Sequence, residues 1–178
     1  TFPASDKVPF GLTISRVTMK KKESTNFELD STDLSILEHI QKDGRMSNSK
    51  LAETVNLSET PCWRRWKKME EEGYIEGYAA RLNRKKLGFQ VSGFTLVTLG
   101  SHEVENTQPF EDYVAESDWI LMCHCIAGGA DYIVQVVAKD LDEYFERISS
   151  IRRVKGVSAI QSNVSVKEIK STFQLPLD

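Results

Sequence analysis

Residues 58–70 read SETPCWRRWKKME, a stretch that combines an apolar face with a basic one. Ser58 is of a type that caps helices, and proline is tolerated in a first turn, so the stretch predicts a helix that begins near Glu59. At about 100° per residue, side chains three and four positions apart share a face. One face carries Cys62, Trp66 and Met69, and the opposite face carries Thr60, Arg64 and Lys67.

The charge distribution around this helix favours a nucleic-acid contact over an ordinary amphipathic surface helix. Residues 30–82 hold 8 Lys/Arg against 10 Asp/Glu, and half of these cations lie within residues 63–68, where there is no acid. Positive charge concentrated on one helix face is the electrostatic footprint of phosphate binding. The three glutamates at residues 70–72 would repel phosphate, so only the N-terminal half of the helix should approach DNA, as a recognition helix does.

Two shorter helices are predicted ahead of the basic helix. Capping residues at 29–33 open the first, which should end at Gly44 in a left-handed cap. The second is capped by Ser47 and extends to Val55. Residues 56–58 then form a tight turn, so short helix, turn and second helix have the spacing of a helix-turn-helix.

Beyond the basic helix, the chain is predicted to leave this module as a wing. The helix should stop at Gly73, and residues 74–82 carry β-forming side chains that favour a short strand. The predicted DNA-binding domain therefore spans residues 29–82. It is flanked by a disordered or vector-derived N-terminal extension over residues 1–28 and by a basic linker over residues 83–88.

Composition predicts a soluble, cytoplasmic protein with no membrane segment. The 178 residues are 40% hydrophobic and 28% charged, with a net charge of −3. That charge argues against nucleic-acid binding over the whole surface, so a DNA contact should be local and shared between subunits. No apolar run approaches the roughly 20 residues that span a bilayer. Three cysteines without an export signal predict reduced thiols.

Residues 89–178 predict a second domain with a different periodicity. Strands are predicted over residues 91–99, 119–126, 132–138 and 157–166, and helices over residues 109–117 and around Leu141, Tyr144, Phe145 and Ile148. The order β-α-β-β-α-β is that of a ferredoxin-like sheet with both helices on one face, which makes the fold class α+β. Because the other face is uncovered, its apolar side chains should be buried in an obligate dimer.

Motifs in both halves of the chain together resemble one protein family. In the first half they are Leu29-Asp30-x-x-Asp33-x-x-Ile36-Leu37, Asp43-Gly44-Arg45, Leu51-Ala52, Ser58-x-Thr60-Pro61-Cys62-x-x-Arg65 and Gly73-Tyr74-Ile75-x-Gly77-Tyr78; in the second half they are Gly128-x-x-Asp131-Tyr132 and the tail KSTFQLPL at residues 170–177. These motifs resemble the Lrp/AsnC transcription regulators. The resemblance implies a winged helix-turn-helix joined to a ferredoxin-like regulatory domain that dimerises and often assembles to octamers. It also implies an amino-acid effector, bound between dimers beside the Gly-x-x-Asp turn.

The candidate DNA-binding residues lie on the second and third helices and at their starts. They are Arg45, Ser47, Asn48, Ser49, Ser58, Thr60, Pro61, Trp63, Arg64, Arg65, Lys67 and Lys68. Thr60, Arg64 and Lys67 are the best candidates for contacts with bases or the groove. Trp63 has two open interpretations, because it would either stack on a sugar or thymine methyl or cover the domain core.

Other members of this set are expected at the DNA backbone. Arg65 lies beside the core stripe of the basic helix and should reach a backbone phosphate, as should Lys68 and Arg45. The N-terminal amides of the second helix, with Asn48 and Ser49 close by, form a natural phosphate seat.

The candidate effector residues surround the glycine-containing turn of the second domain. The resemblance implies His124, Ile126, Gly128, Gly129, Ala130, Asp131 and Tyr132. Backbone amides of the turn would receive a carboxylate, and Asp131 would hold an ammonium group or brace the turn. A purely structural turn is the alternative, since glycines between two strands supply positive φ.

Cys123-His124-Cys125 invites comparison with a metal site. In a strand the two cysteines share one face and His124 points to the other, so the three cannot meet one ion locally. We therefore predict no metal, two small buried thiols, and His124 near the effector cleft.

The sequence predicts a transcription regulator rather than an enzyme. No nucleophile–base pair, P-loop or glycine-rich dinucleotide motif appears, and no cofactor other than an amino-acid effector is expected. The predicted protein binds double-stranded DNA specifically, and effector binding shifts a homodimer between assemblies up to an octamer. Two alternatives stay open: an enzyme resembling the sirohaem decarboxylases, with His102 or His124 as base, and an architectural protein that wraps DNA with little sequence preference.

Overall fold

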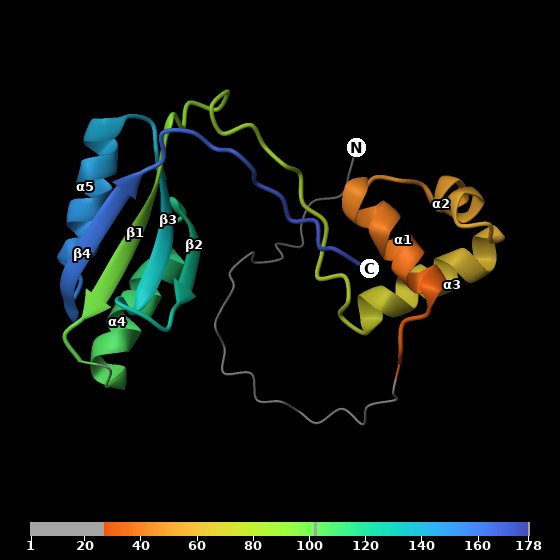
Figure 1. The fold of residues 1–178 in the computed structure, drawn as a ribbon, viewed down its shortest axis with the longest axis horizontal. Helices are drawn as coiled ribbons and strands as arrows, with labels where there is room; N and C mark the ends of the chain where they lie inside the picture. Colours follow the sequence, from red (N-terminus) through yellow and green to blue (C-terminus); the bar gives the residue numbers. More distant parts are fainter. Residues whose placement is uncertain (1–26, 102, 178) are drawn as a thin grey trace, which may run out of the picture. The chain divides into compact units, whose positions relative to one another are not determined.

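Three helices form one unit of the chain, and a sheet with two helices forms the other (Figure 1). The computed structural model describes residues 27–101 and 103–177. Within them, the N-terminal unit comprises residues 27–82 together with 169–177, and the C-terminal unit comprises the described part of residues 83–168. Each unit has its own hydrophobic core.

In the structure the C-terminal tail, residues 169–177, packs with the N-terminal unit, although the sequence assigns it to the second domain. The side-chain amide of Gln41 makes two hydrogen bonds of 2.9 Å to the backbone of Leu175, one with its N–H and one with its C=O. Arg81 also donates to the Ser171 carbonyl at 2.8 Å. The tail is therefore tied to the first helix and to the segment that follows the third.

The segments predicted to flank the DNA-binding domain differ in part from expectation. Residues 1–26 of the predicted extension lie outside the described residues, and Phe27 packs edge-on against Tyr74 with ring centroids 5.8 Å apart. The predicted linker, residues 83–88, folds as a hydrogen-bonded turn of the C-terminal unit, in which the Leu87 N–H donates to the Asn83 carbonyl at 3.2 Å.

The helix-turn-helix of the N-terminal unit follows the prediction closely. Its helices are α1 Ser31–Lys42, α2 Asn48–Thr54 and α3 Glu59–Glu71. The core that they share contains Ile36, Ile40, Leu51, Ala52, Cys62, Trp66 and Met69. The rotation predicted for α3 is confirmed, because all three residues of its apolar stripe are in this core.

The helix caps use only some of the side chains expected. Asp30 and Asp33 form a reciprocal capping box at the start of α1. Ser47 caps α2 by accepting a hydrogen bond from the Lys50 N–H at 3.3 Å, as predicted. Ser58 occupies the N-cap position of α3, but its side chain makes no capping hydrogen bond, which corrects the expected role of that hydroxyl.

The turns of this unit depend on two positive-φ residues, and Gly44 is not one of them. Asn56, with φ of 55°, turns the chain between α2 and α3, and Gly73, with φ of +80°, follows α3. At Gly44 glycine serves close packing, because a Cβ there would lie 3.2 Å from Cδ1 of Tyr78. The predicted strand over residues 74–82 is wrong for the described chain, where this segment has no β-pairing.

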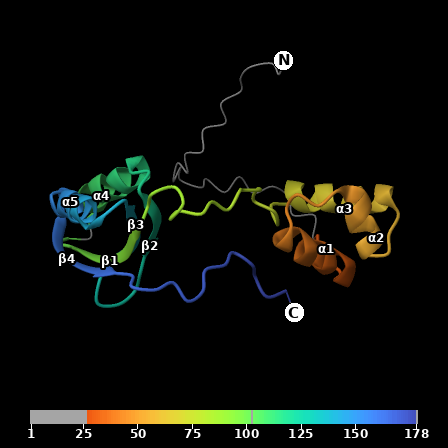
Figure 2. The ribbon, with the colours of Figure 1, turned by 90° about the horizontal axis from the view of Figure 1, so that it is seen from above.

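The C-terminal unit has the predicted β-α-β-β-α-β order. Its elements are β1 Val91–Leu99, α4 Val104–Glu116, β2 Ile120–Cys125, β3 Tyr132–Ala138, α5 Leu141–Arg152 and β4 Val157–Val164. The strands form an antiparallel sheet in the order β2-β3-β1-β4, and both helices lie on one face of it (Figure 2). The ferredoxin-like fold is therefore confirmed.

One helix boundary differs from prediction. The spacing of Phe110, Tyr113 and Val114 predicts a helix that begins at residue 109. In the structure the Thr107 N–H donates to the Glu103 carbonyl at 3.1 Å, so the helix has already begun and Pro109 lies inside it.

Three apolar residues of the predicted strand over residues 157–166 and the predicted helix around Leu141 are exposed. Val166 lies beyond β4, which ends two residues earlier than predicted, and is fully exposed. On α5 the buried stripe consists of Tyr144, Ile148 and Ile151. Leu141 and Phe145 lie outside that stripe and are about half exposed, at 51% and 56%.

Helices pack on one face of the sheet and leave the other face without a covering helix in the C-terminal unit. On the helix-covered face, β1 has a glycine at residue 93 because the Tyr144 hydroxyl occupies the space: a Cβ would lie 2.1 Å from that oxygen. The opposite face has no helix over it in the C-terminal unit (Figure 2). It carries the apolar side chains Phe94, Leu96, Met122 and Ile133, of which Phe94 is 38% exposed.

Candidate nucleic-acid interface and effector turn

The outward face of α3 collects the side chains that were predicted to read DNA. The buried stripe fixes the rotation of the helix and leaves Thr60, Trp63, Arg64 and Lys67 exposed. Trp63 is 49% exposed and packs edge-on against Trp66 with centroids 5.9 Å apart, so it borders the core and also presents a large apolar surface outward. Trp63 therefore covers part of the core, and its contact with DNA stays a prediction.

Lys67 is exposed but has an acidic neighbour on its own helix. Its ammonium lies 2.9 Å from Oε2 of Glu70 and 5.8 Å from the ring centroid of Trp63. The hydrogen bond raises the pKa of Lys67 and lowers that of Glu70. Exposed pairs of this kind contribute about 0–1 kcal/mol, so a phosphate can compete for the lysine.

Arg65 and Lys68, both predicted to reach phosphates, have partners inside the N-terminal unit. Nη1 of Arg65 donates to Asp30 at 2.7 Å and to Asp33 at 2.8 Å, and these bonds, that to Asp33 first, raise the pKa of Arg65. The ammonium of Lys68 lies 3.9 Å from the ring centroid of Phe27. The basic stretch thus separates into two outward cations and two that tie α3 to the start of the unit.

The start of α2 shows a similar division. Ser47 uses its hydroxyl as a cap, and the Asn48 amide donates to the Glu59 carbonyl at 3.0 Å, which joins α2 to α3. Oδ1 of Asn48 is buried without a partner among the described residues. Arg45 and Ser49 are exposed, so they are the members of the predicted phosphate seat whose side chains face outward.

Ser58 and Pro61 lie at the first turn of α3 and complete the predicted set. Ser58 is exposed, and Pro61 is partly buried.

One contact between α3 and the segment that follows it was not predicted from the sequence. The Tyr78 hydroxyl donates to Oε1 of Glu70 at 2.9 Å and accepts a hydrogen bond from Nε1 of Trp66. Burial, before any other cause, raises the pKa of Tyr78 to about 12. The β-forming residues of this segment predicted a strand, and nothing in their pattern predicted that Tyr78 contacts Trp66 and Glu70.

In the C-terminal unit, Asp131 holds the turn of residues 127–131 onto β1. Its Oδ2 accepts a hydrogen bond from the Leu99 N–H at 2.7 Å, and its own N–H donates to the Val97 carbonyl at 3.0 Å. Of the two roles considered for Asp131, bracing the turn is the one that its contacts describe.

The glycines of this turn have no structural requirement within the described chain. Gly128 and Gly129 are exposed, neither has a positive φ, and a Cβ at either would have nothing within 4 Å. The expectation that they supply positive φ is therefore wrong. Their surface is open to a second molecule.

The remaining candidate effector residues do not gather at one place in a single chain. His124 pairs with Ile133 on the uncovered face and is exposed. Tyr132 faces the helices: it is buried, its ring centroid lies 4.8 Å from that of Phe110, and its hydroxyl donates to Glu111 at 2.7 Å. Burial, before this bond, raises the pKa of Tyr132.

Ile126 and Ala130 flank the same turn. Ile126 is partly buried and Ala130 is buried, so neither presents a fully open side chain.

The Cys-His-Cys segment behaves as strand alternation predicts. Cys123 and Cys125 pair with Val134 and Tyr132 and share the helix-covered face, opposite His124. Burial raises the pKa of Cys123 to about 11, whereas Cys125 is exposed, which corrects the expectation of two buried thiols. Among the described residues, no three His, Cys, Asp or Glu side chains are placed to share a metal ion.

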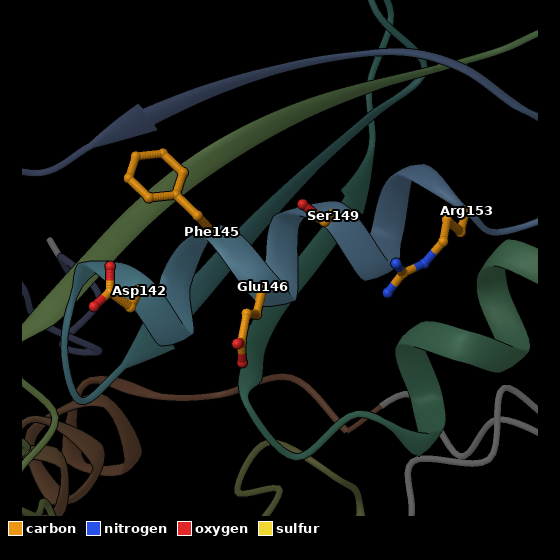
Figure 3. Close-up of a pocket in the computed structure, with 5 residues that line it drawn as sticks. All are labelled: Asp142, Phe145, Glu146, Ser149 and Arg153. Atoms are coloured by element: carbon orange, nitrogen blue, oxygen red, sulfur yellow. The ribbon is translucent and has the colours of Figure 1, made fainter.

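A shallow depression on the outer surface of α5 lies apart from the predicted sites. Figure 3 shows the side chains that line it: Asp142, Phe145, Glu146 and Ser149 of α5, and Arg153 directly after this helix. None of the predicted effector residues is among them.

Comparisons with known proteins identify both units. Residues 29–76 match the model for a winged helix-turn-helix DNA-binding domain, and residues 92–175 match the model for the Lrp/AsnC ligand binding domain. Together these domains define a DNA-binding transcriptional regulator with a ligand-binding domain.

Relatives that this chain matches over nearly their whole length belong to the same class of protein. The chain is 36% identical over 151 residues to the Bkd operon transcriptional regulator of Pseudomonas aeruginosa, covering 84% of this chain and 99% of that one. It is 34% identical to the DNA-binding transcriptional activator DecR of Escherichia coli, with the same coverage of 84% and 99%. The chain belongs to the Lrp/AsnC family of transcriptional regulators.

Solved structures show the same architecture. A transcriptional regulator from Neisseria meningitidis, solved as a complex with L-Met, superposes with a TM-score of 0.82 at 32% identity and covers 85% of this chain and 98% of that one. An AsnC family regulator from Agrobacterium tumefaciens gives 0.79 at 32% identity, with coverage of 84% and 97%. Among the described residues, no helix has the length and apolarity needed to cross a membrane.

Proposed function

We propose that this regulator reads its operator with the outward face of α3 and responds to an amino acid bound at the turn of residues 127–131. The observation that carries the DNA contact is the division of cations on α3: Arg64 and Lys67 face outward, whereas Arg65 is held by two carboxylates of its own unit. Thr60 and Trp63 share the outward face and add a hydroxyl and an apolar surface for base edges.

The protein would act as a homodimer that places two copies of α3 in successive major grooves, about 34 Å apart. The uncovered sheet face supports this, because Phe94, Leu96 and Ile133 form an apolar surface without a covering helix in the C-terminal unit. Association of dimers to an octamer is the further assembly that we propose. Arg45 and Ser49 would add phosphate contacts beside each recognition helix.

The effector would be an amino acid, as in the Neisseria meningitidis regulator solved with L-Met. The open surface at Gly128 and Gly129 supports a site there, where backbone N–H groups can receive a carboxylate. Because His124 and Tyr132 lie on opposite faces of the sheet, we propose that a neighbouring copy supplies the rest of the site. We also infer action by binding without catalysis, since the relatives named above are transcriptional regulators.

A footprint on an operator selected from random DNA tests the DNA half of this proposal. We expect two protected half-sites about one helical turn apart, or a multiple of it, on one side of the duplex. Continuous protection over a long stretch with little sequence preference would favour the architectural alternative, and no protection would contradict the proposal.

A thermal-shift screen against the twenty amino acids tests the effector half, because a ligand that binds only the folded state raises the melting temperature. We expect a shift with one chemical class of amino acid and its loss in Asp131→Ala, which removes the acceptor of the Leu99 N–H and so releases the turn. Absence of any shift would contradict an amino-acid effector and leave the DNA contact standing.

A further inference from the structure

Glu70, at the outer edge of α3, has both carboxylate oxygens engaged by different parts of the chain. Oε2 accepts from the ammonium of Lys67 at 2.9 Å, and Oε1 accepts from the hydroxyl of Tyr78 at 2.9 Å. Lys67 belongs to the DNA-facing side of the helix, whereas Tyr78 belongs to the segment that leaves it. One carboxylate therefore connects the two.

Tyr78 is itself fixed by the core of the N-terminal unit. Its hydroxyl accepts from Nε1 of Trp66, which is only 8% exposed, and the two rings meet edge-on with centroids 6.4 Å apart. The Tyr78 ring also packs at Gly44, where a Cβ would lie 3.2 Å from Cδ1. The hydroxyl thus holds Glu70 from a fixed position.

Holding one partner of an exposed ion pair strengthens the pair. Such pairs are weak largely because two mobile side chains must be ordered together. With Glu70 already ordered by Tyr78, Lys67 loses less freedom on pairing, and a DNA phosphate must compete with a carboxylate that stays in place. The restraint should therefore lower the affinity of Lys67 for phosphate.

We propose that Tyr78 is a positioning residue that limits phosphate binding by Lys67, acting through Glu70. The inference rests on the proposed function in one respect, namely that Lys67 meets DNA. Tyr78 lies between α3 and residue 83, where the chain passes into the C-terminal unit.

The test compares Glu70→Gln and Tyr78→Phe with the unaltered full chain. The probe is a fluorescently labelled mixed-sequence duplex of about 40 bp, and anisotropy is recorded over a series of KCl concentrations, because phosphate contacts are independent of sequence and salt-dependent. Glu70→Gln should tighten binding about two- to fivefold and steepen the salt dependence by up to about one ion. Tyr78→Phe keeps the ring and should act in the same direction with a smaller effect.

The Lys67→Ala background and a control substitution distinguish a positioning role of Tyr78 from a role in stabilising the fold. In Lys67→Ala, Tyr78→Phe should no longer change affinity or salt slope, since the group on which it acts is gone. Glu70→Gln should keep only the gain that comes from removing a carboxylate that repels phosphate. Tyr74→Phe is the matched control: Tyr74 lies on the same segment, is equally exposed at 46%, and donates to the Phe27 carbonyl instead. It should leave DNA binding unchanged.

The outcomes distinguish this inference from the proposed function. If Lys67→Ala does not weaken binding, the DNA contact of Lys67 and the inference both fail. If it weakens binding while Glu70→Gln leaves affinity unchanged or lowers it, only the inference fails. Equal effects of Tyr78→Phe in both backgrounds would likewise overturn it.

Discussion

The outward face of α3 and the turn of residues 127–131 differ in how much of each candidate site one chain supplies. On α3, the outward side chains Arg64 and Lys67 share one exposed face, positioned by a buried stripe on the same helix. At the turn, the expected effector residues divide between the two faces of the sheet. Gly128 has open space where a side chain would be.

This difference shows how a site depends on its scaffold. The helical period and the domain core together determine the direction of every side chain on an amphipathic helix. A site on one face of such a helix is therefore complete in a single chain. A turn between two strands offers backbone groups and little enclosure, and it needs a second surface to complete a pocket. We call a position closed where neighbouring atoms of the chain surround the side chain, and open where they do not. We therefore expect substitutions at closed positions to change stability, and substitutions at open positions to change binding.

The largest effect on stability is expected for Gly93→Ala. A Cβ at this position would lie 2.1 Å from the Tyr144 hydroxyl and 2.8 Å from the Asn163 carbonyl, so the core must shift. We expect a loss of about 3 kcal/mol or more in the unfolding free energy of the C-terminal unit, measured by urea denaturation. Gly128→Ala is the control and should change it by no more than about 0.5 kcal/mol. Similar values for the two would contradict the distinction between closed and open positions.

A smaller loss of stability is expected for Asp33→Ala in the N-terminal unit. Asp33 is 2% exposed, belongs to the capping box of α1 and accepts from Arg65. Its removal should cost about 2–3 kcal/mol, because the cap is lost and Arg65 keeps only Asp30. Denaturation of Arg64→Ala provides the comparison, with an expected change within about 0.5 kcal/mol. An unchanged unfolding free energy in Asp33→Ala would contradict the stabilising role of the Arg65–Asp33 ion pair.

The smallest effect on stability and a clear effect on binding are expected together at Gly128→Ala. Because its Cβ meets no atom of the described chain, the melting temperature without ligand should be unchanged. The thermal shift produced by the amino-acid effector should fall, since a methyl group now occupies the surface where ligand and neighbouring copy would approach. A full shift in this variant would exclude close contact at Gly128.

Sequence was sufficient where periodicity determines orientation. The apolar stripe of α3 and the β-α-β-β-α-β order both follow from spacing, and both are confirmed. The inward direction of Tyr132 was also accessible, because Gln135 is the single polar residue of β3 and marks the opposite face. The turn motif of the family resemblance instead grouped Tyr132 with the effector residues.

Contacts between residues far apart in the sequence could not be predicted from periodicity. Arg65 meets Asp33, 32 positions away, and Tyr78 meets Trp66 across the end of α3. Spacing along α3 places Arg65 beside the core stripe, where a phosphate and a carboxylate are equally consistent partners. Only the three-dimensional arrangement separates Arg65 from Arg64.

The DNA affinity of Arg64→Glu/Lys67→Glu tests the central claim most directly. Anisotropy on the selected operator should show a loss of about 100-fold or more, with an unchanged melting temperature, because two phosphate-attracting groups become repulsive. Lys85→Glu/Lys86→Glu changes the net charge equally at exposed positions outside α3 and should have a far smaller effect. Intact operator binding by the α3 variant would contradict the account.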